Sequence, residues 1–314
     1  MIDNSVPPSA GKKAAFVALA GRPSVGKSTL VNLLCGAKVA IVSAVPQTTR
    51  NAVRGILTRP EGQLVFVDTP GRHASERKFN KMLMTVADRA LEDSEIALYV
   101  LDASRPPGPE EEAVAQKLAA LQDRTIVAIN KIDSPAADPK ALLDFIETML
   151  PEIPAERRFQ ISCLKKQGTD ALAACLFEMA GEGEAFYPDE YYTDQELSFR
   201  ICEIIREKAM NRLREELPHS IYVEVADLEL REITAHGENA ARQRLWIRAF
   251  VITERESQKG MIVGAGGEKI KAIGQAARKE LNSILDWKVD LDLRVKTGKD
   301  WRHNDRTLKK ITGV

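Results

Sequence analysis

The sequence predicts an α/β protein with a mostly parallel sheet, followed by a smaller α+β domain. Three observations support this prediction. Short apolar runs alternate with helical patterns over residues 13–181, which is typical of a parallel sheet covered by helices on both faces. A glycine-rich phosphate-loop motif follows the first apolar run. After a linker-like stretch at residues 182–193, the expected order becomes one helix, two strands, two helices and a strand.

The first apolar run, residues 14–20, has the pattern of a buried strand that leads into a phosphate loop. Residues 21–28 fit G-x-x-x-x-G-K-[ST], and residues 29–34 have the pattern of a helix start. Backbone N–H groups and the helix N-terminus then face the phosphates. Lys27 is expected to reach the β- and γ-phosphates, and Ser28 to bind Mg²⁺. The candidate phosphate contacts are Gly21, Pro23, Ser24, Val25, Gly26, Lys27, Ser28 and Thr29.

The other elements of this half follow in order. The expected strands are residues 53–58, 63–67, 96–101, 126–129 and 159–161, and the expected helices are residues 79–91, 110–121, 140–150 and 170–180. In open sheets of this kind, ligands bind at the carboxyl ends of the strands. Polar motifs placed directly after strands are therefore the candidates for a site.

Three such motifs supply the remaining residues of a predicted nucleotide site. Asp68-Thr69-Pro70-Gly71 offers an aspartate for Mg²⁺ and a glycine N–H for a γ-phosphate. Asn130-Lys131-Ile132-Asp133 offers a carboxylate that can accept two hydrogen bonds from guanine, which adenine cannot supply. Ser162-Cys163-Leu164 is expected to back the base with a backbone N–H. Each motif is weak alone, but their order at successive strand ends favours a guanine-nucleotide site.

Composition restricts the class of protein without naming a partner. A chain of 314 residues with 44% apolar and 29% charged residues is typical of a two-domain globular protein. The net charge is zero, yet residues 241–314 contain 17 Lys/Arg against 9 Asp/Glu, which indicates a surface that faces a polyanion. Four scattered cysteines without a C-x-x-C pair favour a reducing cytosol. No run reaches the length of a transmembrane helix.

The second half has its own pattern. A long helix is expected at residues 196–216, strands at 219–230 and 245–254, and a helical pair around a glycine-rich turn at 261–285. A further strand at residues 287–295 and a basic tail at residues 296–310 follow. This α-β-β-α-α-β order predicts a separate α+β domain rather than more of the first sheet.

The glycine-rich turn matches the G-x-x-G loop with which KH domains clamp about four nucleotides. Its residues are Gly264, Ala265, Gly266 and Gly267, and the neighbouring lysines Lys259, Lys269 and Lys271 are the expected source of phosphate attraction. Arg242, Arg244 and Arg248 are either RNA contacts or a solvated strand edge. Trp287 and Trp301 are expected in the core or in docking rather than as base-stacking platforms.

Together these motifs resemble the translation-factor class of GTPases, and within it the Era-like family of ribosome-assembly GTPases. The resemblance covers residues 13–310 and is most specific in residues 21–28, 68–71 and 130–133, in PQTTR at residues 46–50 and in three runs at 203–208, 215–220 and 253–260. It implies a Ras-like P-loop domain at residues 13–181, after a flexible N-terminus at 1–12. It also implies a linker at 182–193 and a type II KH domain with a basic tail at 194–314.

The resemblance also implies roles that the residues alone do not show. The loop with Thr48 and Thr49 is the first switch, and Thr49 closes over Mg²⁺ beside Ser28 and Asp68. Asp68, Thr69 and Pro70 lead into the second switch. Arg72 stands where many GTPases have a catalytic glutamine, so neither Arg72 nor His73 is a secure catalytic assignment, and we expect slow intrinsic hydrolysis.

One residue of the phosphate loop departs from the family pattern. Ser24 replaces the asparagine that many Era relatives carry, and that asparagine is tied to potassium binding in cousins of the family. Potassium activation is therefore left open.

The activity implied is a GTPase that binds the 3′ region of 16S ribosomal RNA and assists small-subunit assembly, with the GTP or GDP state controlling RNA binding. Mg²⁺ is the implied cofactor. A cytoplasmic monomer with weak peripheral association at the inner face of the cell membrane is the implied setting. Two alternatives stay open, namely a constitutive RNA-binding module with a nucleotide-sensing site and a membrane-surface regulatory GTPase.

Overall fold

The computed structural model describes residues 11–43, 45, 48–71, 78–233, 242–299 and 301–312. Pro46 and Gln47 of the predicted first switch lie outside these residues, as do Arg72 and His73 of the second. Residues 1–10 of the expected N-terminal extension also lie outside them. Within the described residues, no helix combines the length and the apolar character needed to cross a membrane.

The chain divides into two compact units whose membership does not follow sequence order. The first unit comprises Met1–Val39, Arg54–Thr69 and Asp88–Asp194, and the second comprises Ala40–Val53, Pro70–Ala87 and Gln195–Val314. Two segments from the predicted nucleotide-binding half, residues 40–53 and 70–87, therefore pack with the C-terminal part of the chain.

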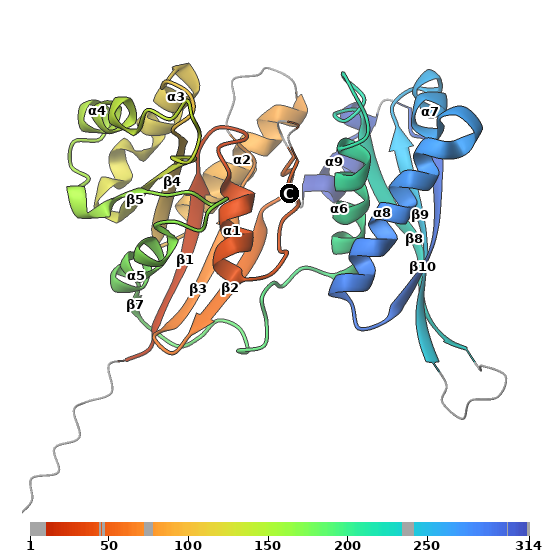
Figure 1. Cartoon of the computed structure of the whole chain (residues 1–314), viewed down its shortest axis with the longest axis horizontal. Helices are drawn as coiled ribbons and strands as arrows, with labels where there is room; N and C mark the ends of the chain where they lie inside the picture. Colours follow the sequence, from red (N-terminus) through yellow and green to blue (C-terminus); the bar gives the residue numbers. More distant parts are fainter. Residues whose placement is uncertain are drawn as a thin grey trace, which may run out of the picture. The chain divides into compact units, whose positions relative to one another are not determined.

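The first unit is built on a mostly parallel sheet, as the sequence predicts. Its strands run in the order β2-β3-β1-β4-β5-β6, and β7 pairs antiparallel with β1 (Figure 1). Strand β1 is parallel to both β3 and β4, and β5 is parallel to β4 and β6. The strands are β1 (Lys13–Ala20), β2 (Val53–Arg59), β3 (Gly62–Asp68), β4 (Ile96–Asp102), β5 (Thr125–Asn130), β6 (Arg158–Gln160) and β7 (Gly181–Glu182).

Helices cover the sheet between its strands. They are α1 (Lys27–Cys35), α2 (Lys78–Glu92), α3 (Pro109–Leu118), α4 (Pro139–Met149) and α5 (Thr169–Met179), with 3-10 turns at Ala119–Arg124 and Ala155–Arg157. Strands β1, β4 and β5 are covered on both faces, and side chains pointing to either face are buried. Apolar residues therefore occupy nearly every position of these strands.

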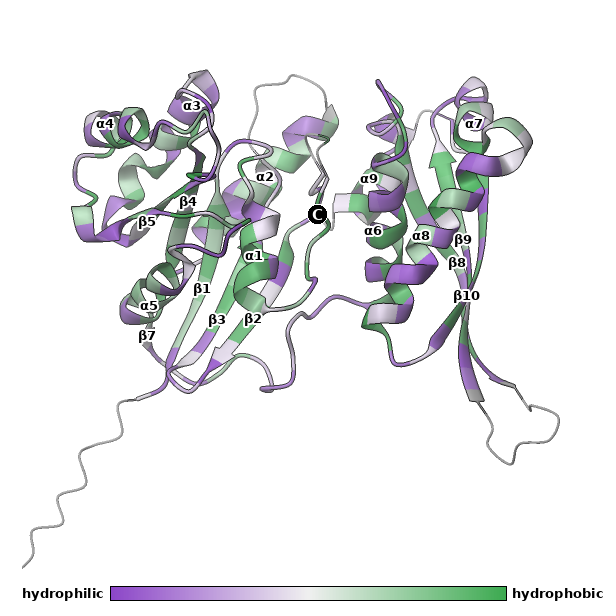
Figure 2. Ribbon diagram, viewed as in Figure 1, coloured by the Kyte–Doolittle hydropathy of each residue, from purple (hydrophilic) through white to green (hydrophobic). Residues whose placement is uncertain are grey.

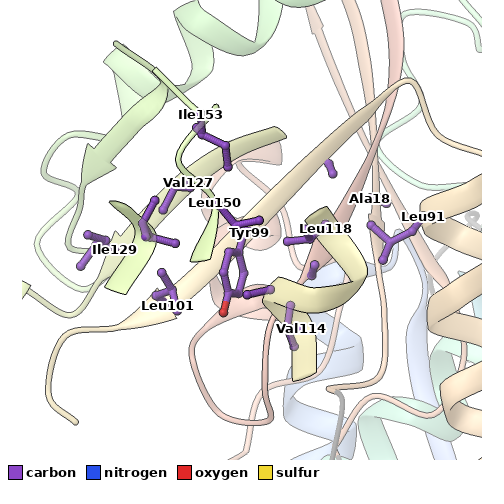
Figure 3. Packing of buried hydrophobic residues seen from close by; sticks show 14 of the residues in the cluster. Ala18, Leu91, Tyr99, Leu101, Val114, Leu118, Val127, Ile129, Leu150 and Ile153 are labelled. Carbon is purple, nitrogen blue, oxygen red and sulfur yellow. The ribbon is translucent and has the colours of Figure 1, made fainter. Parts of the chain in front are cut away.

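One core cluster joins strands β1, β4 and β5 to helices α2, α3 and α4. Tyr99 lies fully buried at its centre between Leu101 and Leu118, with Val114 and Leu150 around them (Figure 3). The hydroxyl of Tyr99 donates to a backbone carbonyl of α3, that of Glu111, at 3.1 Å. The polar end of this large side chain is thereby satisfied inside the core.

The second unit has a three-stranded sheet in the order β10-β9-β8, with β8 antiparallel and β10 parallel to the central strand. Helices α6 and α8 lie side by side against one face of it (Figure 1). Its elements are α6 (Leu197–Met210), β8 (Ile221–Ile233), β9 (Arg242–Thr253), α7 (Glu256–Val263), α8 (Glu268–Ile284), β10 (Lys288–Thr297) and α9 (Asp305–Thr312), with 3-10 turns at Ala265–Gly267 and Trp301–His303.

The expected α-β-β-α-α-β order is therefore confirmed. Helix α8 is amphipathic, and Figure 2 shows hydrophilic and hydrophobic stretches alternating along it. Its buried residues Ile273, Ala277 and Leu281 recur every fourth position and face the core.

The helix expected over residues 196–216 ends earlier, at Met210. Beyond it the chain turns, and Glu215 takes a left-handed conformation with φ of 56°. The side chain of Leu213 in this turn packs in the core of the second unit. Helical propensity is a weak preference that tertiary packing overrides.

We predict that Leu118→Ala destabilises the first unit by about 2–5 kcal/mol, because removing a fully buried leucine leaves a cavity. Urea unfolding followed by circular dichroism measures the change. Leu164→Ala is the matched control, since the side chain of Leu164 is 82% exposed. Its effect should stay within about 0.5 kcal/mol. Equal losses in the two variants would contradict the packing described here.

Candidate functional site

The phosphate-loop motif folds into a tight turn between β1 and α1. Gly21 and Gly26 have φ values of 144° and 106°, and Ser24 has a φ of 65°. A Cβ at Gly21 would collide with the Val100 carbonyl, and a Cβ at Gly26 would collide with the Asn130 side-chain nitrogen. Both glycines are thus required by φ and by close approach. Helix α1 begins at Lys27, directly after the loop.

Lys27 is buried under this loop. Its Nζ donates to the carbonyls of Gly21 and Arg22, at 2.9 and 3.0 Å. Burial lowers the pKa of Lys27 to about 8, Asp68 partly opposes that shift, and Arg22 adds to it. The Lys27 ammonium is suited to binding an anion, because a bound phosphate favours the charged form of the lysine.

Ser28 and Asp68 meet at the ends of α1 and β3. The Ser28 hydroxyl donates to Asp68 Oδ2 at 2.6 Å, and Asp68 is fully buried. Next to them, the Thr69 hydroxyl donates to the Leu19 carbonyl at 2.7 Å and fixes the start of the following loop. A hydroxyl and a carboxylate side by side are hard oxygen donors of the kind that Mg²⁺ prefers, so the pair fits that ion.

Asn130 connects the phosphate loop to the base-recognition loops. Its amide nitrogen donates to the Val25 carbonyl at 2.8 Å, and its oxygen accepts from the Cys163 backbone N–H at 3.1 Å. The two hydrogen bonds use both ends of the amide. As a result, three loops distant in sequence are held at fixed spacing.

Asp133 accepts a hydrogen bond from the Ser162 hydroxyl, which in turn accepts from the Lys165 backbone N–H at 3.0 Å. The Leu164 side chain points to solvent, so only its backbone can serve the site. Burial, together with nearby Asp133, raises the pKa of the Cys163 thiol to about 12. Cys163 therefore stays protonated and unreactive at neutral pH.

Sequence reasoning missed an ion cluster beneath these loops. Asp102, at the end of β4, pairs with the Lys131 ammonium at 2.7 Å and with Arg22 at 3.4 Å. Arg22 also pairs with Glu111 of α3. Lys131 has a φ of 65° and donates in addition to the Ser24 carbonyl at 2.8 Å. The cluster ties Lys131 to the phosphate loop.

The carboxyl of Asp102 stays ionised at the centre of this cluster. Burial alone would raise its pKa, but hydrogen bonds from Lys131 and Ser104 outweigh burial and lower it. A signal existed in the sequence, because Asp102 ends a strand as Asp68 and Asn130 do. The strand-end argument that selected those two residues applies to it equally.

The remaining predicted nucleotide residues belong to the second unit. Thr48, Thr49, Pro70 and Gly71 fall in its segments 40–53 and 70–87, whereas Asp68 and Thr69 fall in the first unit. The Thr48 hydroxyl donates to the Val45 carbonyl at 2.7 Å, which folds the loop on itself.

The G-x-x-G turn of the second unit lies between α7 and α8, as predicted. Gly264, Gly266 and Gly267 have φ values of 75°, 55° and 79°. A Cβ on Gly264 would lie 2.8 Å from that of Lys269, whereas the space around Gly266 and Gly267 is open. The backbone of the turn is therefore accessible to a close ligand, and α8 begins at Glu268 with its N–H groups beside the turn.

The three predicted lysines differ in their surroundings. Lys259 pairs with Glu256 at 3.3 Å, and Lys269 Nζ donates to the Met261 carbonyl at 2.9 Å. Lys271, two residues further along α8, is exposed.

The strand arginines Arg244 and Arg248 lie on β9, the central strand of its sheet, and pair with carboxylates on the neighbouring strands, while the side chain of Arg242 lies outside the described residues. Arg244 pairs with Asp290 at 2.9 Å, and Arg248 pairs with Asp227 and Asp292, each at 3.3 Å. Trp301 is buried and Trp287 packs against the core, as expected of core residues.

Comparison with known proteins agrees with this geometry. Residues 16–131 match a family described as 50S ribosome-binding GTPases, and residues 216–302 match the KH domain family. GTPase Era of Treponema denticola is 45% identical over 299 residues, covering 95% of this chain and 99% of its own. The chain belongs to the Era family of GTPases. GTPase Era of Borreliella burgdorferi is 42% identical over 299 residues, with the same coverage.

Solved structures of Era extend the likeness to three dimensions. A point variant of Aquifex aeolicus Era bound to GDP.AlF4⁻ matches with a TM-score of 0.87 at 35% identity, covering 95% of this chain and 98% of its own. Era in complex with MgGDPNP and nucleotides 1506–1542 of 16S ribosomal RNA matches with the same TM-score and identity, covering 96% and 98%. This Era-family GTPase thus combines a Ras-like P-loop domain with a KH domain.

We predict that Asp102→Asn weakens GDP binding roughly 10- to 100-fold, because hydrogen bonds to charged groups contribute about 1.5–3 kcal/mol and Lys131 would lose its carboxylate. Dissociation of a fluorescent GDP followed by stopped flow measures the change. Glu147→Gln is the control, since Glu147 forms an exposed pair with Arg158. An unchanged dissociation rate in Asp102→Asn would refute the positioning role.

A second prediction concerns protons. Because the pKa of Lys27 is about 8 in the free protein, nucleotide binding at pH 8 should take up about half a proton, and affinity should fall as pH rises through 8. Calorimetry in buffers of different ionisation enthalpy measures the uptake. Lys117→Met removes a surface lysine paired with Asp88 and should leave it unchanged. Zero uptake in the wild type would contradict the assignment.

Proposed function

We propose that this GTPase binds 16S ribosomal RNA near its 3′ end and assists assembly of the small ribosomal subunit. In this proposal the bound GTP or GDP controls RNA binding and release. The observation that carries it is the match, over 96% of the chain, to Era in complex with MgGDPNP and the 3′ segment of that RNA. The open G-x-x-G turn and the connected phosphate and base loops support it independently.

The residues proposed to hold the nucleotide divide by the part they contact. The phosphates are assigned to Gly21, Pro23, Ser24, Val25, Gly26, Lys27, Ser28, Thr29 and Gly71, and guanine to Asn130, Lys131, Asp133, Ser162, Cys163 and Leu164. Asp133 sets base choice, since a carboxylate can accept two hydrogen bonds from guanine. Leu164 contributes only through its backbone.

Ser28, Asp68 and Thr49 are proposed to hold Mg²⁺, which supplies charge neutralisation at the β- and γ-phosphates when bound. The chain's own contribution to hydrolysis is positioning: Lys27 holds the phosphates, and Thr48, Thr49, Asp68, Thr69 and Pro70 form the proposed switch residues. No glutamine follows Gly71 in the sequence. Slow intrinsic turnover is the consequence, because electrostatic positioning acts without a dedicated water-orienting amide.

The RNA side of the proposal uses the turn between α7 and α8. Gly264, Ala265, Gly266 and Gly267 would approach the RNA backbone, and Lys259, Lys269 and Lys271 would supply positive charge. Lys269 would exchange its bond to the Met261 carbonyl for a phosphate, while Lys271 needs no such rearrangement.

The setting of this activity is part of the proposal. We assign the catalytic half to residues 13–181, the linker to 182–193 and the RNA-binding half to 194–314, after a flexible stretch at 1–12. The protein is proposed to act as a cytoplasmic monomer with weak peripheral association at the inner face of the membrane.

We predict that RNA containing nucleotides 1506–1542 of 16S ribosomal RNA binds more tightly with a non-hydrolysable GTP analogue than with GDP. Ala265→Asp should weaken that binding about tenfold or more, because it places a negative charge at the phosphate-facing turn. Filter binding at fixed salt measures both effects. Ala113→Asp makes the same substitution at an exposed position of α3 in the first unit and is the control.

Two outcomes would redirect the proposal. Equal RNA affinity with the two nucleotides would favour a constitutive RNA-binding module with a nucleotide-sensing site. Binding to anionic liposomes in preference to this RNA at matched salt would favour a membrane-surface regulatory GTPase.

A further inference from the structure

The segment at residues 40–53 is fastened to the C-terminal part of its own unit at several points. The Val42 backbone N–H donates to Glu207 Oε1 at 2.8 Å, and the Ser43 hydroxyl donates to the Asn211 side-chain oxygen at 2.8 Å. Glu207 lies on α6, and Asn211 follows that helix directly. The proposed first switch is thus hydrogen-bonded to α6, the first helix of the RNA-binding half.

Arg50 forms the innermost of these attachments. Its side chain is buried, and its guanidinium donates to the carbonyls of Ile221 at 2.6 Å and His219 at 3.2 Å. Two aromatic rings enclose it, with centroids 5.5 Å away for Phe79 and 5.8 Å away for Trp301. Ile221 is the first residue of β8 and His219 precedes that strand by two residues, so Arg50 joins the switch segment to the sheet of the second unit.

Trp301 completes the enclosure from the C-terminal end of the chain. Its indole N–H donates to the Ser220 carbonyl at 3.0 Å, and the ring is 2% exposed. Its ring centroid lies 5.1 Å from that of Tyr222 and 5.8 Å from that of Phe79. Phe79 lies on α2 within residues 70–87, so this tryptophan contacts one residue from each of the segments 40–53 and 70–87.

Arg206 of α6 holds the same segment on the other side of Thr49. Its guanidinium donates to the Thr48 carbonyl and to both oxygens of Glu203, and it contacts the Met210 sulfur at 3.3 Å. The side chain is buried. The backbone is therefore fastened by Arg206 at Thr48 and by Arg50 two residues later.

These two guanidinium groups are costly to bury together. Burial lowers the pKa of Arg50, and the nearby charge of Arg206 lowers it further, while Glu203 opposes both. Such an arrangement persists because carbonyl and carboxylate acceptors with fixed geometry surround it. Arginine suits this place better than lysine, since its planar fork reaches two carbonyls at once.

We propose that Arg50 and Arg206 are positioning residues that couple the nucleotide state to RNA binding. Thr49, the switch threonine of the proposed nucleotide site, lies between their two attachment points. Any movement of Thr49 toward the nucleotide must carry the second unit with it or break these bonds. The inference rests on the proposed function, because it requires that GTP and RNA influence each other's binding.

The test measures coupling in the full-length protein. The affinity for RNA 1506–1542 is determined with a non-hydrolysable GTP analogue and with GDP, and the ratio of the analogue's affinity to that of GDP is determined with and without that RNA. Coupling factors of about 5–150 are typical, and the factor must be the same from either pair of measurements. In Arg50→Lys and Arg206→Lys we expect this factor to fall toward 1. A merely structural defect would lower the affinities and leave the coupling factor unchanged.

Arg54→Lys is the matched control, because Arg54 lies on β2 and forms an exposed pair with Asp194. It should keep the wild-type coupling factor. Asn211→Ala loosens the segment at an exposed hydrogen bond without disturbing buried charge, and it should lower the factor partially. If both arginine variants fail to fold, the coupling factor of Asn211→Ala is the test of the proposal.

The outcomes separate the two levels of the proposal. A wild-type coupling factor of 1 would overturn the GTP-controlled switch itself, whatever the variants do. A wild-type factor above 5 that persists in the folded variants would overturn only the role of Arg50 and Arg206.

Discussion

The side chain of Asn130 is the contact on which the nucleotide site depends. One amide donates to the phosphate loop at Val25 and accepts from the base-recognition loop at Cys163. It fits only because Gly26 has no Cβ in its path. A neutral group that is donor and acceptor at once can link two backbones without the cost of burying a charge. A single side chain therefore holds the phosphate loop and the proposed base-recognition loop at a fixed spacing.

Buried charged side chains also hold loops in place at two other sites, one in each unit. In the first unit the carboxylate of Asp102 is central, and the cations Lys131 and Arg22 gather around it. In the second unit Arg50 binds backbone carbonyls, and Arg206 binds the Thr48 carbonyl together with the carboxylate of Glu203. Buried ion clusters contribute little net stability. Their value here is that each one fixes a loop whose position matters for a ligand.

The division of the chain into two units does not follow the order of elements along the sequence. Asp68 ends a strand of the first unit, while Pro70, two residues later, already belongs to the second. The same change occurs between Val39 and Ala40. Each proposed switch segment is thus covalently continuous with the nucleotide site and packed with the RNA-binding half. That arrangement gives a physical route by which one ligand affects the other.

The sequence by itself determined the fold class, the family and the main site motifs, because residues 21–28, 130–133 and 264–267 carry their chemistry in consecutive positions. It overextended the helix after residue 196, since the turn after Met210 depends on tertiary packing and not on the local helical pattern. The partners of Asp102 and Arg50 also escaped it. Arg22 lies 80 residues from Asp102, and Ile221 lies 171 residues from Arg50. Only the tertiary structure decided those contacts, because burial selects partners by distance in space and not along the chain.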